Sequence, residues 1–199
     1  MHRQIPDWLD VSRETLDKLD HFASEVLRWT PAINLISKSS MDQIWQRHII
    51  DSAQMYGLGD PAVKWVDMGS GGGFPGIVMA IMGAQDMVLV ESDRRKATFL
   101  QQMARQMNLP VTVLPKRTHD LAPQGANTVS ARALASLTQL LDHATPHLNS
   151  CGRAVFPKGR AVDAELAEAG EKWVFESTRV PSKTDPEAAI LVIENIRRR

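Results

Sequence analysis

The chain has 199 residues, with 23 basic and 23 acidic side chains and a formal net charge of zero. This length suits one domain with an appended helical piece, and the balanced charge disfavours a strongly basic nucleic-acid binder. The single cysteine, Cys151, excludes an intrachain disulfide framework and a multi-cysteine zinc site, and we expect it to be buried. Because the N-terminus is polar and no apolar run approaches the roughly 20 residues of a membrane span, we expect a cytoplasmic protein without a membrane partner.

Residues 1–62 are predicted to form a helical N-terminal extension. Apolar residues at positions 16, 19, 23, 26 and 27 have the spacing of one helix face. Pro31 is expected to end or kink this helix. A second helix is expected over residues 41–58, with a cap among residues 39–42.

From residue 63 to residue 199 the pattern changes to alternating strands and helices. Strands are expected at 63–69, 87–92, 111–115, 127–134 and 152–159, and helices at 74–83, 94–108, 137–148 and 161–173. Residues 174–181 and 188–196 are expected to form a terminal antiparallel pair. Strands that alternate with helices of about 10–15 residues predict a Rossmann-like α/β domain with a mostly parallel sheet and helices on both faces.

The most informative motif is WVDMGSGGGFPG at residues 65–76, which places five glycines between a predicted strand and a predicted helix. Glycine adopts positive φ and allows a ligand to approach the backbone closely. The helix that follows presents unpaired N–H groups, and ligands of open α/β sheets bind at the carboxyl ends of the strands. We therefore interpret the motif as a ligand-binding loop rather than a connecting turn.

Two acidic residues narrow the choice of ligand. Asp67 ends the first strand of the domain, and Glu91 ends the second, where a carboxylate can accept hydrogen bonds from ribose hydroxyls. That pattern serves both NAD and S-adenosylmethionine. An acidic opening made of Asp67, Gly69 and Gly71 suits the cationic S-adenosylmethionine and would repel a pyrophosphate, so we favour S-adenosylmethionine as the cofactor. A P-loop motif is absent from the sequence, which disfavours a nucleotidase.

Seven segments occur in a fixed order along the chain: WTPAINL (29–35), RHIIDS (47–52), VDMGSGGGFPGI (66–77), LVESDRRKATFL (89–100), KRT (116–118), SARALASL (130–137) and PKG (157–159). Together they resemble the bacterial family of small-subunit ribosomal RNA guanine-N7 methyltransferases, also called glucose-inhibited division protein B. The resemblance implies a class I S-adenosylmethionine-dependent methyltransferase with a seven-stranded sheet and a helical N-terminal part. It also implies methylation of N7 of one guanine in 16S rRNA.

The resemblance also implies roles for individual residues around the cofactor. Gly69 and Phe74 match positions of the cofactor loop, and Glu91 matches the acid that binds the ribose. Thr118 and His119 match a pair whose backbone lies beside the adenine. The family usually has an acidic residue in place of His119. A contact through backbone amides would tolerate this change, whereas a contact through a carboxylate would be lost.

Arg132 matches the arginine that the family assigns to the cofactor and substrate pocket. N7 of neutral guanine carries a lone pair and no proton, so its methylation needs no general base. What the reaction needs is in-line approach of N7 to the methyl group and exclusion of water. We hypothesise that Arg132 is the catalytic residue, which orients the guanine or steadies charge during transfer. The alternative is a surface arginine paired with a nearby acid.

Three further residues are candidates for the substrate side of the site. His48 and Asp51 are three positions apart on one predicted helical turn, and either help to close the substrate pocket or brace the cofactor loop. Lys158 either holds a phosphate or is a solvated lysine. Phe74 either stacks on a base or, as we favour, forms a wall of the cofactor site. The histidines have no convincing metal-ligand spacing, so no metal is expected.

Three rival functions stay open: a methyltransferase for a small molecule or protein, an NAD-dependent dehydrogenase, and a non-catalytic ribosome-binding factor. Six basic and nine acidic residues give residues 1–63 a charge of −3, which leaves +3 on residues 64–199. This charge is low for binding that depends on neutralising many phosphates. The expected partner is therefore 16S rRNA within the small ribosomal subunit or a precursor particle, recognised by a few placed contacts.

Overall fold

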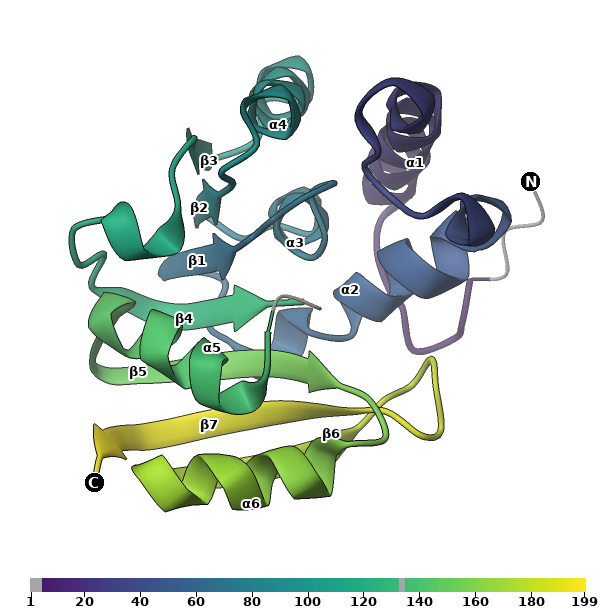
Figure 1. The fold of residues 1–199 in the computed structure, drawn as a ribbon. Helices are drawn as coiled ribbons and strands as arrows, with labels where there is room; N and C mark the ends of the chain where they lie inside the picture. Colours follow the sequence, from purple (N-terminus) through teal and green to yellow (C-terminus); the bar gives the residue numbers. More distant parts are fainter. Residues whose placement is uncertain (1–4, 133–134) are drawn as a thin grey trace.

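The computed structural model describes residues 5–132 and 135–199, and its centre is one seven-stranded sheet. The strand order is β3-β2-β1-β4-β5-β7-β6, in which β1 to β5 pair in parallel and β7 runs antiparallel to both of its neighbours (Figure 1). The mostly parallel Rossmann-like sheet and the terminal antiparallel pair are thus confirmed. The strands are β1 (Lys64–Met68), β2 (Asp86–Val90), β3 (Val111–Leu114), β4 (Ala126–Ala131), β5 (Leu148–Lys158), β6 (Trp173–Pro181) and β7 (Ala189–Arg198).

Helices cover both faces of the sheet, as the alternating pattern predicts. Side chains alternate along each strand, so Trp65 and Leu89 belong to one buried cluster while Val66 and Val88 belong to the other. Figure 1 shows α1, α3 and α4 on one side of the sheet and α5 and α6 on the other. The helices are α1 (Arg13–Ile33), α3 (Gly76–Ile81), α4 (Arg94–Gln106), α5 (Leu137–Ala144) and α6 (Val162–Lys172). In the described part of the chain, no helix is long and apolar enough to cross a membrane.

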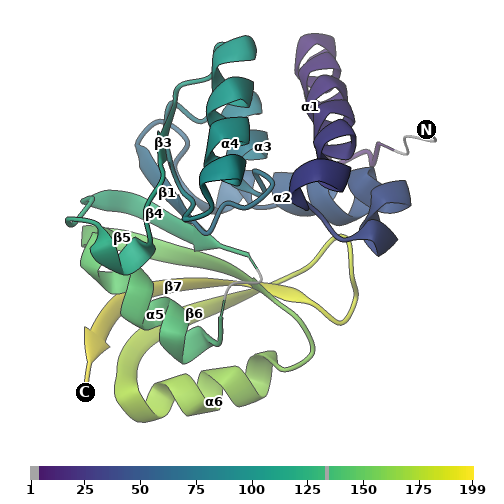
Figure 2. The ribbon, with the colours of Figure 1, turned by 45° about the horizontal axis from the view of Figure 1, so that its top comes forward.

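The N-terminal helix α1 packs into the core of the sheet domain. Ser12 caps its start by accepting a hydrogen bond from the N–H of Thr15, at 3.1 Å. On its buried face, the ring of Phe22 lies 5.3 Å from that of Phe74 and 6.4 Å from that of Phe99. Figure 2 shows α1 standing beside α3 and α4. Since residues 1–62 and 63–199 share this core, their division into an extension and a domain stays a proposal.

Two helical predictions differ from the structure. Helix α1 continues through Pro31 and ends two residues beyond it, at Ile33, where Asn34 adopts a φ of 53°. Proline lacks only its own N–H, so the residues after it still donate, and the last turn closes through the 2.8 Å bond from the N–H of Asn34 to the carbonyl of Thr30. Residues 41–58 are not one helix, since a π-helix at Trp45–Ile50 leads into α2 (Asp51–Ala53).

The irregular segment continues on both sides, with 3-10 helices at Lys38–Gln43 and Tyr56–Leu58. The apolar spacing does not identify the π turn, because a spacing of four residues, as between Trp45 and Ile49, fits one face of an α-helix and of a π-helix alike. Cys151 is exposed rather than buried, because β5 begins four residues earlier than expected and this first part precedes its buried stretch. The predicted strand at 127–134 ends at Ala131, and positions 133 and 134 lie outside the described residues.

We expect Phe22→Ala to destabilise the whole protein by about 3–5 kcal/mol, the usual cost of removing a buried phenylalanine. Phe22 of α1 is fully buried and packs against Phe74 in the glycine loop and Phe99 of α4, so its loss leaves a cavity in the shared core. Urea denaturation measures the change. The exposed neighbour provides the control, since His21→Ala should change the free energy of unfolding by less than about 0.5 kcal/mol. A loss confined to α1, with the remaining domain at full stability, would contradict the shared core.

Candidate functional site

A cavity of about 990 Å³ lies at the carboxyl ends of the parallel strands. This is the edge at which open α/β sheets bind ligands. The glycine loop after β1 forms one wall, and His48 and Asp51 belong to the opposite helical segment. Arg132 after β4, Lys158 at the end of β5 and the loop between β6 and β7 complete the lining.

The glycine loop is held beside Glu91 by a direct hydrogen bond. The N–H of Gly71, whose φ is 54°, donates to one oxygen of the Glu91 carboxylate at 2.8 Å. The N–H of Asp93 donates to the other oxygen at 2.7 Å. Glu91 is 8% exposed, so its carboxylate has a defined position while each oxygen keeps a free lone pair. The Glu91 carboxylate is therefore held beside the glycine loop, where it can accept hydrogen bonds from hydroxyl groups of a ligand.

The sequence predicts that Asp67 contacts the cofactor, but its side chain lies away from the cavity. Its side chain is fully buried and accepts hydrogen bonds from the Ser130 hydroxyl, at 2.8 Å, and from the N–H of Gly76, at 3.2 Å. Burial raises the pKa of Asp67 to about 6. A Cβ at position 76 would lie 2.2 Å from a methyl carbon of Leu89. Only glycine therefore allows the N–H of residue 76 to approach the Asp67 carboxylate this closely. The carboxylate joins β1, β4 and α3 and does not line the cavity, because its strand position directs it toward α3.

Phe74 forms part of the cavity wall. Its ring is 4% exposed and lies 4.9 Å from the ring of His48. The guanidinium of Arg132 lies over the same ring, 5.3 Å from its centre, in a cation–π contact. This packing favours the interpretation of Phe74 as a wall rather than as a platform for a base. It also joins the glycine loop to the residues that face it.

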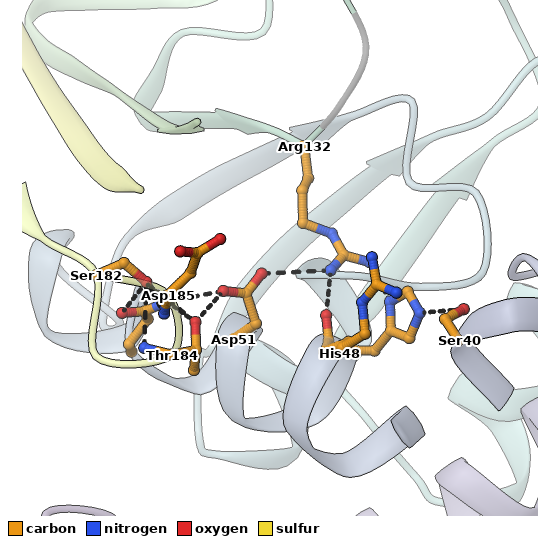
Figure 3. Close-up of polar contacts among 9 residues, drawn as sticks. Ser40, His48, Asp51, Arg132, Ser182, Thr184 and Asp185 are labelled. Carbon is orange, nitrogen blue, oxygen red and sulfur yellow. Dashed lines mark hydrogen bonds and ion pairs between the residues drawn. The ribbon is translucent and has the colours of Figure 1, made fainter. Parts of the chain in front are cut away.

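Arg132, His48 and Asp51 are brought together as a polar group on that wall (Figure 3). One terminal nitrogen of Arg132 donates to the carbonyl of Arg47, at 3.0 Å, and lies 3.4 Å from Asp51 Oδ2. The second terminal nitrogen of Arg132 donates to His48 Nδ1 at 2.8 Å. Arginine is only a donor, so His48 Nδ1 is the acceptor and its Nε2 carries the proton that is donated to the Ser40 hydroxyl, at 2.9 Å.

The electrostatic surroundings keep His48 uncharged. Burial, followed by the charges of Arg132 and Arg47, lowers the pKa of His48 to about 4. Burial also lowers the pKa of Arg132, against the opposite effect of the Asp51 carboxylate. At neutral pH the group therefore consists of a neutral imidazole, one guanidinium and one carboxylate. Both ring nitrogens of His48 are engaged, Nδ1 by Arg132 and Nε2 by Ser40, so neither is free to take a proton from a ligand.

Lys158 lines the cavity but is neither solvated nor unpaired. Its side chain is 7% exposed, and its ammonium group donates to Glu165 at 2.7 Å and to the carbonyl of Ala135 at 3.0 Å. The same oxygen of Glu165 accepts the N–H of Leu137 at 2.6 Å. Of the two alternatives for Lys158, the solvated lysine is wrong, because the side chain is buried against Ala135 and Glu165. Lys158 holds Ala135 and the start of α6 together, and its charge is already balanced.

Thr118 and His119 lie outside the lining of the cavity. They form the 3-10 helix Thr118–Asp120, which follows β3 at the same edge of the sheet. The carbonyl of Thr118 accepts a hydrogen bond from His147 Nε2 at 3.2 Å, and the His119 side chain is 58% exposed. Over residues 5–132 and 135–199, the structure brings together no group of three or more His, Cys, Asp or Glu that could hold a metal ion.

Two residues of the site escaped the sequence analysis. Thr184, on the loop between β6 and β7, donates from its hydroxyl to Asp51 Oδ1 at 2.7 Å. Gln54 donates from its amide nitrogen to the same oxygen at 2.9 Å. Asp51 and Thr184 are 133 positions apart, and no local pattern marks either partner of such a contact.

Comparison with known proteins gives consistent relatives over almost the whole chain. The family model GidB, described as rRNA small subunit methyltransferase G, matches residues 15–190. A protein named ribosomal RNA small subunit methyltransferase G from Cereibacter sphaeroides is 48% identical over 98% of this chain and 97% of its own. One of the same name from Paramagnetospirillum magneticum is 46% identical over 94% and 92%.

Solved structures share the fold at low sequence identity. TYW2 from M. jannaschii in complex with AdoMet superimposes with a TM-score of 0.58 at 15% identity, covering 82% of this chain and 78% of that one. A SAM dependent methyltransferase from Aquifex aeolicus gives a TM-score of 0.58 at 12% identity, covering 86% and 97%. These two structures show the class I methyltransferase fold alone.

We expect the ring signals of His48 in an NMR titration to stay constant between about pH 5.5 and 8, where an ordinary histidine gains a proton. The reason is that burial and the nearby arginine charges disfavour the charged imidazole, so His48 gains a proton only near pH 4. Arg132→Ala removes one of these charges and should raise the pKa of His48. Arg95→Ala, which changes an exposed arginine on α4, is the control and should not. A midpoint near 6.5 in the wild-type protein would contradict the buried, neutral imidazole.

Proposed function

Because the chain belongs to the GidB family, rRNA small subunit methyltransferase G, we propose that it transfers a methyl group from S-adenosylmethionine to N7 of a guanine in 16S rRNA. The observation that carries the proposal is the cavity, which joins the glycine loop to the wall of Arg132, His48 and Asp51. Family membership disfavours an NAD-dependent dehydrogenase. The intact loop and its bond to Glu91 disfavour a ribosome-binding factor without catalytic activity.

The residues at the glycine loop fit S-adenosylmethionine. A Cβ added at Gly71 would meet only a backbone oxygen 3.7 Å away, so this part of the loop is open to a ligand. Glu91 would accept the ribose hydroxyls, and the loop at Gly69 and Gly71 would hold the methionine part. S-adenosylmethionine supplies a methyl group activated by its sulfonium. Asp67 serves this site indirectly, by holding the loop and α3 against β4.

Thr118 and His119 are proposed to bound the adenine side of the cofactor. His119 has an exposed side chain and stands where the family usually has an acidic residue. We therefore assign this contact to backbone groups, which histidine and an acidic residue present equally. This choice makes cofactor binding insensitive to the side chain at position 119.

Arg132 has the chemistry to orient the guanine. A guanidinium has five N–H groups, of which the contacts to Arg47, Asp51 and His48 use only part. The others are available to O6 of the base or to its phosphate. No residue has to remove a proton from N7, which agrees with a neutral His48 whose Nδ1 is already bonded. Alignment of N7 with the methyl group is then the main task, and proximity and orientation together can contribute roughly 7–11 kcal/mol.

Pairing of surface charges limits how the protein can bind RNA. On the β5–β7 side, Arg153 pairs with Glu194 at 3.0 Å, and Arg198 pairs with Asp142 at 2.9 Å. These arginines and the buried Lys158 are therefore poorly suited to many phosphate contacts. Lys116 and Arg117 are exposed after β3, near the cofactor edge, and we assign the few phosphate contacts to them. This supports a folded small-subunit particle as the substrate of a cytoplasmic enzyme.

Mapping of 16S rRNA by mass spectrometry tests the proposed function. RNA from cells with the protein should contain one N7-methylguanine that RNA from cells lacking the gene does not contain. Reintroducing the wild-type chain should restore the modification. Retention of every N7-methylguanine in the deletion would overturn the proposal, and transfer of methyl groups to free metabolites instead would favour the rival methyltransferase.

Two substitutions should separate cofactor binding from substrate orientation. Glu91→Gln should weaken binding of S-adenosylhomocysteine roughly ten- to a hundredfold, because a charged acceptor is replaced by an amide. Arg132→Ala should lower turnover on small-subunit particles by a larger factor than it lowers affinity for S-adenosylhomocysteine. Calorimetry and methyl incorporation measure the two effects, with Glu171→Gln on the exposed face of α6 as the control. Near wild-type turnover of Arg132→Ala would refute its role.

A further inference from the structure

Asp51 divides its two carboxylate oxygens between different partners. Oδ2 faces Arg132, at 3.4 Å from the guanidinium nitrogen. Oδ1 accepts from the Thr184 hydroxyl at 2.7 Å and from the Gln54 amide at 2.9 Å (Figure 3 shows the Thr184 contact). The bonds to Oδ1 fix the rotation of the carboxylate, and this rotation decides where Oδ2 lies.

The orientation of the Gln54 amide is determined by a donor on the opposite side. The backbone N–H of Lys183 points at Gln54 Oε1 from 2.8 Å, and an N–H group can only donate. The oxygen of the amide must therefore face Lys183, which leaves the nitrogen to donate to Asp51. The same nitrogen lies 3.2 Å from the hydroxyl oxygens of Ser182 and Thr184.

The loop between β6 and β7 is shaped to present Thr184. The Ser182 hydroxyl accepts the backbone N–H of Thr184 at 3.2 Å and that of Asp185 at 3.3 Å, so the turn folds over this oxygen. These bonds hold Thr184 over the helical segment that carries Asp51. The loop itself lines the same cavity as the glycine loop.

We propose that Thr184 and Gln54 are positioning residues for methyl transfer. They hold Asp51 Oδ1, so that the other oxygen, Oδ2, fixes the guanidinium of Arg132. We call Asp51, Gln54 and Thr184 the Asp51 clamp. The proposal rests on the proposed function, because it concerns the residue that orients the guanine. It gives the β6–β7 loop a role in the reaction.

The need for a clamp follows from the surroundings of Arg132. The arginine side chain is 18% exposed, and its other contacts are neutral: the ring of Phe74, the imidazole of His48 and the carbonyl of Arg47. Asp51 supplies the negative charge that compensates the guanidinium. An arginine side chain has many rotamers, so a counter-charge that itself rotates would leave the guanidinium in several positions. A carboxylate held by two donors does not rotate freely.

The first test uses NMR and needs neither cofactor nor RNA. Thr184→Val keeps the shape of the side chain and removes the hydroxyl. If the clamp holds Arg132 beside His48, this change should raise the pKa of His48 above its value of about 4, because the arginine charge spends less time near the ring. Thr184→Ser should restore the wild-type value. Thr178→Val, on the exposed side of β6, makes the same change in the same hairpin and should have no effect.

The second test measures methyl transfer to small-subunit particles in a single turnover. Thr184→Val should slow transfer roughly two- to tenfold, the range that follows from losing one hydrogen bond. Affinity for S-adenosylhomocysteine should stay at the wild-type value. In an Arg132→Ala background Thr184→Val should have no further effect on the rate, because a positioning residue acts only through the group it positions.

The outcomes distinguish the clamp from the proposed function. An unchanged pKa of His48 in Thr184→Val, or an equal slowing with and without Arg132, would overturn the clamp. Failure of the wild-type chain to methylate the particles would overturn the proposed function, and the NMR comparison would still decide whether Thr184 positions Arg132. A raised pKa that Thr184→Ser reverses, together with a rate effect that depends on Arg132, supports the clamp.

Discussion

The buried carboxylate of Asp67 is the contact on which the geometry of the site depends. It accepts the hydroxyl of Ser130 on β4 and the N–H of Gly76 at the start of α3, so one side chain joins two strands and a helix. Trp65 extends the same network by donating its indole N–H to Ser130 at 3.0 Å. Burial raises the pKa of Asp67 to about 6, and hydrogen bonding from Ser130, Ser70 and Gly76 offsets part of the effect of burial. The glycine loop lies between Asp67 and Gly76, so these bonds define both of its ends.

A second set of contacts faces this loop from the N-terminal segment. Phe74 packs against Phe22 of α1 on one side and against His48 and Arg132 on the other. The N-terminal part of the chain therefore supplies one side of the cavity wall as well as part of the core. Its irregular helical turns place His48 and Asp51 toward the arginine that follows β4. The chemistry assigned to the site requires position rather than proton transfer, and neutral, packed side chains suit that requirement.

The pairing of charged side chains on the surface agrees with the zero formal net charge of the chain. Lys158, Arg153 and Arg198 each have a carboxylate partner, so much of the positive charge in the sheet domain is balanced locally. Surface pairs of this kind contribute little stability, but they weaken the field available to phosphates. Recognition of a folded RNA particle by shape and a few basic residues is consistent with such a surface.

The amino-acid sequence is enough to predict the order of the strands and helices along the chain, the position of the glycine loop and the edge of the sheet to which Glu91 and Arg132 belong. These features depend on local periodicity and on residues near one another in the chain. The tertiary structure alone decided the direction of the Asp67 side chain, the burial of Lys158 and the bond from Thr184 to Asp51. Each of these depends on which distant segment lies opposite, and hydrophobic periodicity does not contain that information. The π-helix before α2 was also not predictable from the sequence, because over six residues an apolar spacing of four fits both an α turn and a π turn.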